Sequence, residues 1–269
     1  MSKAAVFFDI DGTLGWNDPS KENELPIDQR GLSPVPSPRV ASAIQKLVNN
    51  GNHAFLCTGR PVDGIHPDLA RLPFEGGIYL AGGYVEAHGK VLLDAPFGRE
   101  LLLKIGKHIE KSPTGAKIEG KHDLVQFCGG LAGNLAETPH SMDEAIEMID
   151  SHTVYKIILP TPVADGIAQD PELSQLVTIS ALELNNSEVS PRANTKRNGV
   201  RSVLALMGDA VDKSYGIGDA ENDVSLLDEV DVAIAMGNAV DAAKQHADFV
   251  TASVDEDGVV VALNHYGLI

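Results

Sequence analysis

Several short, mostly apolar runs constrain the fold of this 269-residue chain more than any other feature of its sequence. These runs cover residues 4–8, 53–57, 78–80, 215–217 and 232–235. They lack the alternation of apolar and polar residues, which is typical of strands buried on both faces of a parallel sheet. Segments with helical spacing, such as 40–48, lie between the runs. The sequence therefore predicts an α/β fold with a doubly wound parallel sheet.

The pattern changes between residues 83 and 184, where strands and helices no longer alternate regularly. The expected elements in this stretch are a hairpin over 85–93, helices over 99–110 and 141–149, and strands over 123–128, 155–159 and 177–182. The earlier pattern returns with a helix over 196–207. We therefore expect a Rossmann-like core formed by residues 1–82 and 185–269, interrupted by an inserted α+β domain over 83–184.

Composition limits the partners of the chain. A formal net charge of −17 argues against binding to nucleic acid or to an anionic membrane surface. An anionic small molecule is compatible with this charge if the site supplies its own positive charge. The sequence has two cysteines, no leader-like start and no apolar run of membrane-spanning length, so we expect a cytoplasmic location.

The strongest chemical signal is a pair of acids directly after the first predicted strand. Asp9 and Asp11 are separated by one residue and are followed by Gly12 and Thr13. Doubly wound sheets bind ligands at the carboxyl ends of their strands, so one acid can act as a nucleophile or metal ligand and the other as a general acid or base. A loop with two solvated acids would explain an isolated pair better. The buried run before this pair favours the functional interpretation.

A second acidic cluster, Gly218-Asp219-Ala220-Glu221-Asn222-Asp223, ends another predicted strand and opens a helix. Acids at this position also have a purely structural explanation, because they stabilise a helix N-terminus. Asp219 and Asp223 can nevertheless share a hard cation such as Mg²⁺, which binds a few carboxylates together with water and substrate oxygens. Taken alone, the pattern leaves both explanations equally open.

Two smaller signals supply groups that can hold an anion. The segment Thr58-Gly59-Arg60 follows the second predicted strand, where a hydroxyl and free amides can bind phosphate oxygens, although a plain turn is the commoner explanation. Lys196 opens a helix, and Arg192 and Arg197 are its rivals for an anion-binding role. Together the four signals supply a nucleophile, an acid, a hydroxyl, a cation and a metal site, which are the parts that phosphoryl transfer needs.

The order of these motifs resembles that of the haloacid dehalogenase-like phosphatases, specifically the Cof-type branch, in which a large cap domain is inserted after the third strand. The resemblance covers nearly the whole chain. It rests on Asp9-Ile10-Asp11-Gly12-Thr13-Leu14, Thr58-Gly59-Arg60, Lys196, Gly218-Asp219-Ala220-Glu221-Asn222-Asp223, Ala235-Met236-Gly237-Asn238-Ala239 and Asp257-Gly258-Val259. Two segments depart from the family pattern: the proline-rich stretch 15–38 is longer, and residues 190–195 match poorly.

The resemblance implies a role for each site residue. Asp9 would attack phosphorus and form a phospho-aspartate, while Asp11 would protonate the leaving alcohol and later deprotonate the hydrolytic water. The residues that would hold the phosphate are Thr58, Gly59, Lys196 and Asn222, with Arg60 as a further substrate contact. The ligands of Mg²⁺ would be Asp9, the backbone carbonyl of Asp11, Asp219 and Asp223.

The activity implied by the resemblance is a Mg²⁺-dependent phosphatase for small phosphorylated metabolites, acting as a monomer or small homo-oligomer. Hexose and pentose phosphates, pyridoxal phosphate and flavin mononucleotide all fit. A phosphomutase would share the nucleophile, but mutases of the family typically carry a smaller helical cap. A non-catalytic regulator that binds phosphorylated metabolites would be expected to lose Asp9 or Asp11, and both are present.

Overall fold

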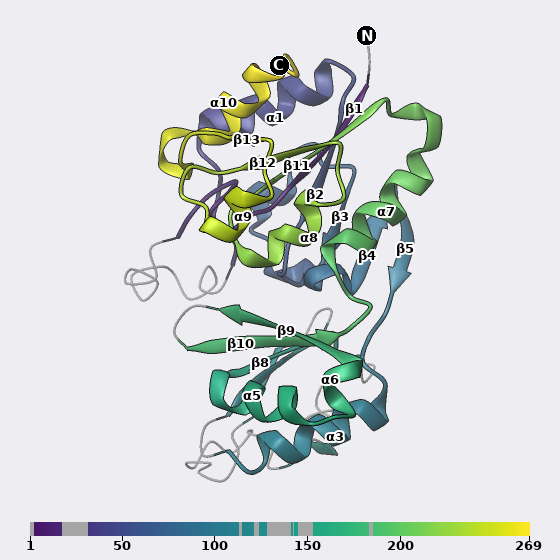
Figure 1. Ribbon diagram of the computed structural model, residues 1–269. Coiled ribbons are helices and arrows are strands. Elements are labelled where there is room, and N and C mark those ends of the chain that lie inside the picture. The colour runs from purple at the N-terminus through teal and green to yellow at the C-terminus, as the bar shows by residue number, and fades with distance from the viewer. Residues whose placement is uncertain are drawn as a thin grey trace. The chain divides into compact units, whose positions relative to one another are not determined.

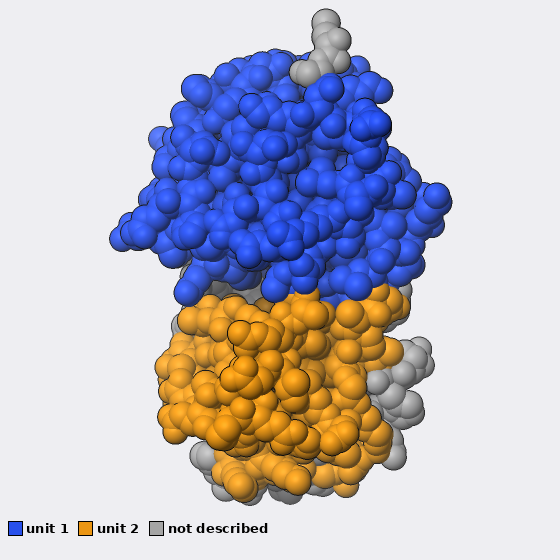
Figure 2. Space-filling view, turned by 45° about the vertical axis from the view of Figure 1, so that its right-hand side comes forward, with its two compact units in different colours: residues 1–93, 195–269 blue, residues 94–194 orange. Residues whose placement is uncertain are grey.

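Strand pairing divides the chain into two units, each with its own sheet. The computed structural model describes residues 3–17, 32–112, 115–120, 124–127, 141, 143–144, 153–182 and 185–269. Unit 1 comprises residues 1–93 and 195–269, and unit 2 comprises residues 94–194 (Figure 2). Most of the stretch 15–38, most of the expected helix over 141–149 and the ends of the expected strand over 123–128 lie outside the described residues.

The sheet of unit 1 has eight strands in the order β13-β12-β11-β1-β2-β3-β4-β5 (Figure 1). These strands are β1 (Ala4–Phe8), β2 (His53–Cys57), β3 (Gly76–Tyr79), β4 (Tyr84–Ala87), β5 (Lys90–Asp94), β11 (Lys213–Gly218), β12 (Val232–Ala235) and β13 (Phe249–Val250). β1 pairs in parallel with β2 on one side and with β11 on the other. The chain therefore winds outward in both directions from β1, which confirms the predicted doubly wound α/β fold.

Helices cover both faces of this sheet. They are α1 (Pro38–Asn49), α2 (Pro67–Ala70), α7 (Lys196–Met207), α8 (Val224–Leu227), α9 (Asp241–Gln245) and α10 (Gly258–His265). α1 and α10 lie side by side, and α7 lies on the opposite face of the sheet (Figure 1). All five residues of β1 are buried, and Phe7 belongs to the apolar cluster that contains Val200 and Val203 of α7. Burial on both faces explains why the strand lacks polar alternation.

The hairpin that follows β3 belongs to the core sheet of unit 1. β3 pairs with β4 in an antiparallel register in which Ile78 is opposite Val85, and β5 extends the sheet beyond β4. The sequence analysis instead assigned this hairpin to the insert, with boundaries at 83 and 184. Since Val85 and Ala87 are buried in the same cluster as Ile78, the chain leaves unit 1 only after the hairpin.

Unit 2 contains a five-stranded sheet in the order β7-β6-β8-β10-β9, with antiparallel pairs. Its elements are α3 (Arg99–Ile109), β6 (Ala116–Glu119), β7 (Leu124–Phe127), β8 (Lys156–Pro160), α5 (Thr161–Gln169), α6 (Leu173–Leu176), β9 (Val177–Leu182) and β10 (Asn186–Pro191). Helices α3 and α5 pack together, and their buried side chains form one apolar cluster with Ile118, Ile157 and Val189 of the sheet. Unit 2 therefore has a hydrophobic core of its own.

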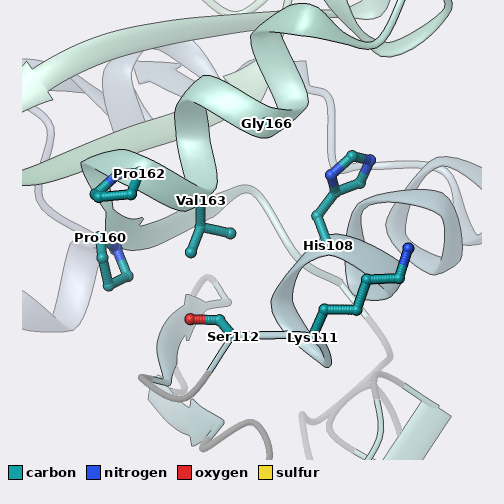
Figure 3. A pocket seen from close by; sticks show the side chains of 7 residues that line it. All are labelled: His108, Lys111, Ser112, Pro160, Pro162, Val163 and Gly166. Carbon is teal, nitrogen blue, oxygen red and sulfur yellow. The ribbon is translucent and has the colours of Figure 1, made fainter.

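A cavity of about 410 Å³ lies within unit 2, between the end of α3 and the start of α5 (Figure 3). Its lining residues are His108, Lys111, Ser112, Pro160, Pro162, Val163 and Gly166. All the residues that line this cavity belong to unit 2, whereas the predicted site residues belong to unit 1. Within the described ranges, no helix is both long and apolar enough to span a membrane.

Candidate active site

Asp9 lies at the point where β1 ends. Its backbone N–H donates to the carbonyl oxygen of Ile217 at 2.9 Å, which continues the pairing of β1 with β11 by one residue. The Asp9 side chain is 8% exposed, and its Oδ1 accepts a hydrogen bond from Lys196 Nζ at 2.6 Å. The sheet therefore fixes both the position and the direction of this carboxylate.

Lys196 links Asp9 to the second acidic cluster. It is the first residue of α7, a helix capped by Thr195, whose Oγ1 accepts the backbone N–H of Asn198 at 3.2 Å. Lys196 Nζ donates to Asp9 Oδ1 and also to Asp223 Oδ1 at 2.5 Å. Both Lys196 and Asp223 are buried. A buried ammonium group thus lies between two buried carboxylates and is in direct contact with both.

The two arginines that compete with Lys196 in the sequence are engaged elsewhere. Arg197 donates to Asp228 at 2.8 Å on the surface of unit 1. Arg192 lies in unit 2, where it donates to the carbonyl oxygen of Ser174 at 2.9 Å. The geometry therefore selects Lys196 as the cation beside Asp9.

Asp223 has a structural task as well as a place in the site. Its Oδ2 accepts the backbone N–H groups of Asp219 and Ala220, both at 2.9 Å, at the start of the short 3₁₀ helix Glu221–Asp223. Gly218 lies so close that a Cβ atom there would be 2.5 Å from Asp223 Cγ. The structural explanation of this acidic cluster therefore holds, and the same carboxylate also contacts Lys196. The shared cation stays a prediction.

Asp9, Asp219 and Asp223 form a cluster that could hold a metal ion. Each offers one carboxylate oxygen, and these oxygens all lie within 4.8 Å of one another. Three carboxylates face a single ammonium group, so negative charge is left over in a largely buried place. Oxygen ligands and excess negative charge are what a hard divalent cation such as Mg²⁺ requires. The donor set therefore fits this ion.

The pKa values of these groups reflect the same excess of negative charge. Burial raises the pKa of Asp9 well above its usual range, and Asp223 raises it further despite the opposing effect of Lys196. Burial and then Asp223 raise the pKa of Asp219 to about 7. Burial alone would lower the pKa of Lys196, but Asp223 and Asp9 outweigh it and keep Lys196 protonated.

Two residues to which the sequence analysis gave no role hold the loop after β1 in place. Thr13 Oγ1 donates to Asp219 Oδ1 at 3.0 Å, and Asn238 Nδ2 donates to the carbonyl oxygen of Gly12 at 2.9 Å. Gly12 has a φ of 83°, and a Cβ atom there would lie 2.2 Å from Asp219 Oδ2. Thr13 and Asn238 both lie in segments that carry the resemblance, so their positions in those motifs were the available signal.

Asp11 is oriented differently from the buried carboxylates. Its side chain is 50% exposed and forms a two-bond ion pair with Arg60, in which Nε and Nη2 each donate at 2.7 Å. Thr58 is buried and connects to this pair through its Oγ1, which accepts the Arg60 N–H at 3.1 Å. The structure thus joins Arg60 to Asp11, whereas the resemblance implied a contact between Arg60 and substrate.

Asn222 lies in the short 3₁₀ helix between Asp219 and Asp223. Its Oδ1 is buried, and among the described residues it accepts no hydrogen bond. A buried acceptor atom without a hydrogen bond is costly, and rotation of the terminal amide exchanges its donor and acceptor atoms. Asn222 is therefore available to a ligand. Gly59 lies in the turn between Thr58 and Arg60, directly after β2.

A doubly wound core with carboxylates and a lysine at its strand ends is typical of enzymes that transfer phosphoryl groups. Comparison with known proteins narrows the class to the phosphoric monoester hydrolases. Residues 6–263 match the family described as haloacid dehalogenase-like hydrolase, and the chain belongs to this family. The predicted family and enzyme class, a phosphatase of the haloacid dehalogenase-like superfamily, are thereby confirmed.

Individual relatives extend over the whole chain. The protein is 31% identical over 271 residues to the 5-amino-6-(5-phospho-D-ribitylamino)uracil phosphatase YcsE of Bacillus subtilis, covering 98% of this chain and 95% of the relative. Among solved structures it is similar in fold to the HAD subclass IIB sugar phosphatase BT4131, with a TM-score of 0.76, 22% identity and complete coverage of both chains. The phosphatase BT1666 of Bacteroides thetaiotaomicron has a TM-score of 0.74 at 21% identity, with 100% of this chain and 96% of that chain covered.

Proposed function

We propose that this protein hydrolyses phosphate monoesters of small metabolites by transferring the phosphoryl group to Asp9, with Mg²⁺ as cofactor. The observation that carries the proposal is the buried carboxylate of Asp9, which ends β1, contacts Lys196 and lies within 4.8 Å of oxygens of Asp219 and Asp223. A nucleophile, a fixed cation and a cluster of metal ligands thus meet at one strand end.

Each site residue of unit 1 has a separate role in the proposed phosphoryl transfer. Asp9 Oδ attacks phosphorus, and Lys196, which contacts Asp9 and Asp223, supplies positive charge to the phosphoryl oxygens. The residues that bind the remaining phosphate oxygens are Thr58, Gly59 and Asn222. Asp9, Asp219, Asp223 and the backbone carbonyl of Asp11 would hold Mg²⁺, which would supply positive charge and lower the repulsion between a carboxylate nucleophile and an anionic phosphate.

Asp11 serves both half-reactions as the proton-transfer group. It gives a proton to the leaving alcohol when the bond to Asp9 forms, and it takes a proton from the water that cleaves the phospho-aspartate. Its exposed side chain suits this role, since it must meet both the leaving group and water. The carboxylates of Asp9 and Asp223 are instead buried and hydrogen-bonded to Lys196.

We further propose that unit 2 acts as the cap domain that selects the leaving group. Support comes from its independent core and from its insertion between β5 and α7, the helix that begins with Lys196. The relatives named above act on a ribitylamino-uracil phosphate and on sugar phosphates, so a sugar phosphate or a similar small ester is the expected substrate class. A cytoplasmic location stays a prediction.

Release of inorganic phosphate from a panel of phosphorylated metabolites tests this function. The panel is run with Mg²⁺ and with a chelator, on the wild type, Asp9→Asn and the matched control Asp68→Asn, which changes an exposed acid paired with Arg71. We expect Mg²⁺-dependent release that Asp9→Asn abolishes and Asp68→Asn retains. Release that survives Asp9→Asn would show that Asp9 is not the nucleophile. A folded wild type that releases phosphate from no compound would oppose the proposed activity.

A further inference from the structure

The ion pair between Arg60 and Asp11 fixes the position and orientation of the Asp11 carboxylate, which is the proposed proton-transfer group. Arg60 Nε donates to Asp11 Oδ2, and Arg60 Nη2 donates to Oδ1, both at 2.7 Å. Two parallel bonds fix the position and the plane of a carboxylate, which a single lysine contact does not do. Because Asp11 is half exposed on a loop, its carboxylate would otherwise sample several rotamers in water.

The backbone of Arg60 is itself held firmly. Its N–H donates to Thr58 Oγ1, and its carbonyl oxygen accepts the N–H of Leu80 at 3.0 Å. The carbonyl oxygen of Thr58 accepts the N–H of Ala81 at 3.1 Å. Leu80 and Ala81 have φ values of 52° and 55°, a left-handed conformation that persists in non-glycine residues only where the surroundings enforce it. The turn after β2 is thus joined to the turn after β3, which gives the Arg60 side chain a rigid base.

We infer that Arg60 is the positioning residue of Asp11, an inference that rests on the proposed function. Arg60 takes one lone pair on each Asp11 oxygen and leaves the other free for substrate or water. In the first step, the Asp11 proton passes to the ester oxygen as the bond from phosphorus to that oxygen breaks and the bond from phosphorus to Asp9 forms. In the second, a water proton passes to Asp11 as the water oxygen bonds to phosphorus and the phosphorus–Asp9 bond breaks. Arg60 keeps the carboxylate in one place for both transfers.

This role can be tested with two substrates whose leaving groups differ in how much they need a proton. p-Nitrophenyl phosphate releases a stable phenolate and needs little protonation, whereas a primary alkyl phosphate needs a great deal. We expect Arg60→Gln to lower kcat for the best alkyl substrate of the panel by about tenfold or more, a part of the roughly 10²–10⁴-fold that general acid–base catalysis contributes. The loss of kcat on p-nitrophenyl phosphate should be much smaller. The ratio of kcat on the alkyl substrate to kcat on p-nitrophenyl phosphate should therefore fall. Arg60→Lys keeps the charge but loses the paired bonds, and its ratio should fall too.

Two further variants make the test decisive. In an Asp11→Asn background, Arg60→Gln should not lower the ratio further, because both changes remove the same contribution. Arg71→Gln removes an exposed arginine paired with Asp68 in the same unit and should leave the ratio unchanged. The positioning role would be overturned if Arg60→Gln lowered kcat equally on both substrates. It would also be overturned if the fold-loss in the Arg60→Gln, Asp11→Asn double variant were the product of the two single losses. Thermal melting checks that each variant is folded. Phosphate release by Asp9→Asn would instead refute the underlying function, whatever the ratio.

Discussion

Gly12 shows how a single residue can join the loop after β1 to the carboxylate cluster of Asp9, Asp219 and Asp223. Its φ of 83° favours glycine, and the absence of a Cβ lets Asp219 approach. The Gly12 carbonyl oxygen also accepts the hydrogen bond from Asn238. Any side chain at this position would therefore have two effects, because it would strain the backbone and would also displace Asp219.

We predict that Gly12→Ala lowers stability by more than the roughly 1 kcal/mol that a left-handed alanine costs. It should also weaken Mg²⁺ binding, since a Cβ atom would lie 2.2 Å from Asp219 Oδ2. Gly51→Ala is the matched control, because Gly51 has a φ of 87° but no atom within 4 Å of its Cβ position. Urea unfolding and calorimetric Mg²⁺ titration measure both effects. Equal behaviour of the two variants would rule out the clash with Asp219.

A pH dependence follows from the raised pKa of Asp219. The folded-state value of about 7 lies above the usual 3.8, so the folded protein without metal holds this proton more tightly than the unfolded chain does. The resulting stability is present at low pH and is lost as pH rises through about 7. Mg²⁺ needs the deprotonated carboxylate, so its binding offsets this loss at higher pH.

We therefore expect Mg²⁺ to raise the melting temperature more at pH 8 than at pH 5.5. Scanning calorimetry at the two pH values, with Mg²⁺ and with chelator, measures the difference. Asp219→Asn keeps the size of the side chain but removes one of the two groups with a raised pKa, so the pH dependence of the Mg²⁺ effect should become smaller in that variant, with a remainder from Asp9. An equal Mg²⁺ effect at both pH values in the wild type would contradict the prediction.

At the residue scale, the sequence predicted the composition of the site better than its contacts. Asp9, Asp219 and Asp223 could be foreseen as neighbours, because parallel strands bring their carboxyl ends to one edge of the sheet. The pairing of Arg60 with Asp11 could not, since it depends on how the Thr58–Arg60 turn bonds to Leu80. Hydrogen bonds between loops depend on tertiary geometry that local patterns do not encode.

At the scale of elements, α7 positions Lys196 by close packing against the sheet. Gly199 faces β3 so closely that a Cβ atom would lie 2.5 Å from Ile78 Cγ2. The helix can approach the strand only because that side chain is missing. This approach brings the first turn of α7, with Lys196, toward the strand ends where Asp9 lies.

We predict that Gly199→Ala destabilises the protein by about 1–3 kcal/mol through overpacking, although alanine favours helix by about 1 kcal/mol. Adding Ile78→Ala should relieve the clash, so the double variant should be less destabilised than the sum of the single variants. Gly166→Ala in α5 is the control, because its Cβ would meet only His108 Nδ1 at 3.5 Å. That control should be neutral or slightly stabilising in chemical denaturation. Additive effects of Gly199→Ala and Ile78→Ala would argue against the contact.

The elements with a clear apolar pattern were the easiest to predict from the sequence. β1, β2 and α7 have the expected bounds, because continuous apolar runs and a clear helical period leave few alternatives. The β4–β5 hairpin was placed in the wrong sheet, since its own pattern shows that two strands pair but not which third strand they join. α5 was not predicted, and its sequence contains Pro162 and Gly166, which weaken the helical signal.

At the scale of the whole molecule, unit 2 has the features of an independently folding domain. It is one continuous segment, and its core cluster contains no residue of unit 1. Its two ends are tied together, because Asn194 Nδ2 donates to the carbonyl oxygen of Ala95 at 2.8 Å. Domains with adjacent ends and a separate core commonly tolerate excision.

We predict that residues 94–194 expressed alone unfold cooperatively on heating. Circular dichroism should show one sigmoidal transition, and Ile157→Ala, which removes a fully buried side chain of the unit 2 core, should lower its midpoint. The exposed Leu176→Ala should change it little. A segment without a cooperative transition would show that unit 2 depends on unit 1 for its fold.

The chain passes from unit 2 back into unit 1 at Thr195, and this position limits how domain chimaeras can be made. Thr195 is clamped, since its Oγ1 caps α7 and its carbonyl oxygen would lie 2.2 Å from a Cβ at Gly82. The next residue is Lys196, which must reach Asp9 and Asp223. A graft that exchanges one insert for another can be spliced freely up to Asn194, but its downstream seam must leave the Thr195-Lys196 dipeptide with the host. A chimaera joined one residue later would lose the Thr195 cap of α7, and one joined two residues later would also lose the ammonium group that contacts Asp9 and Asp223.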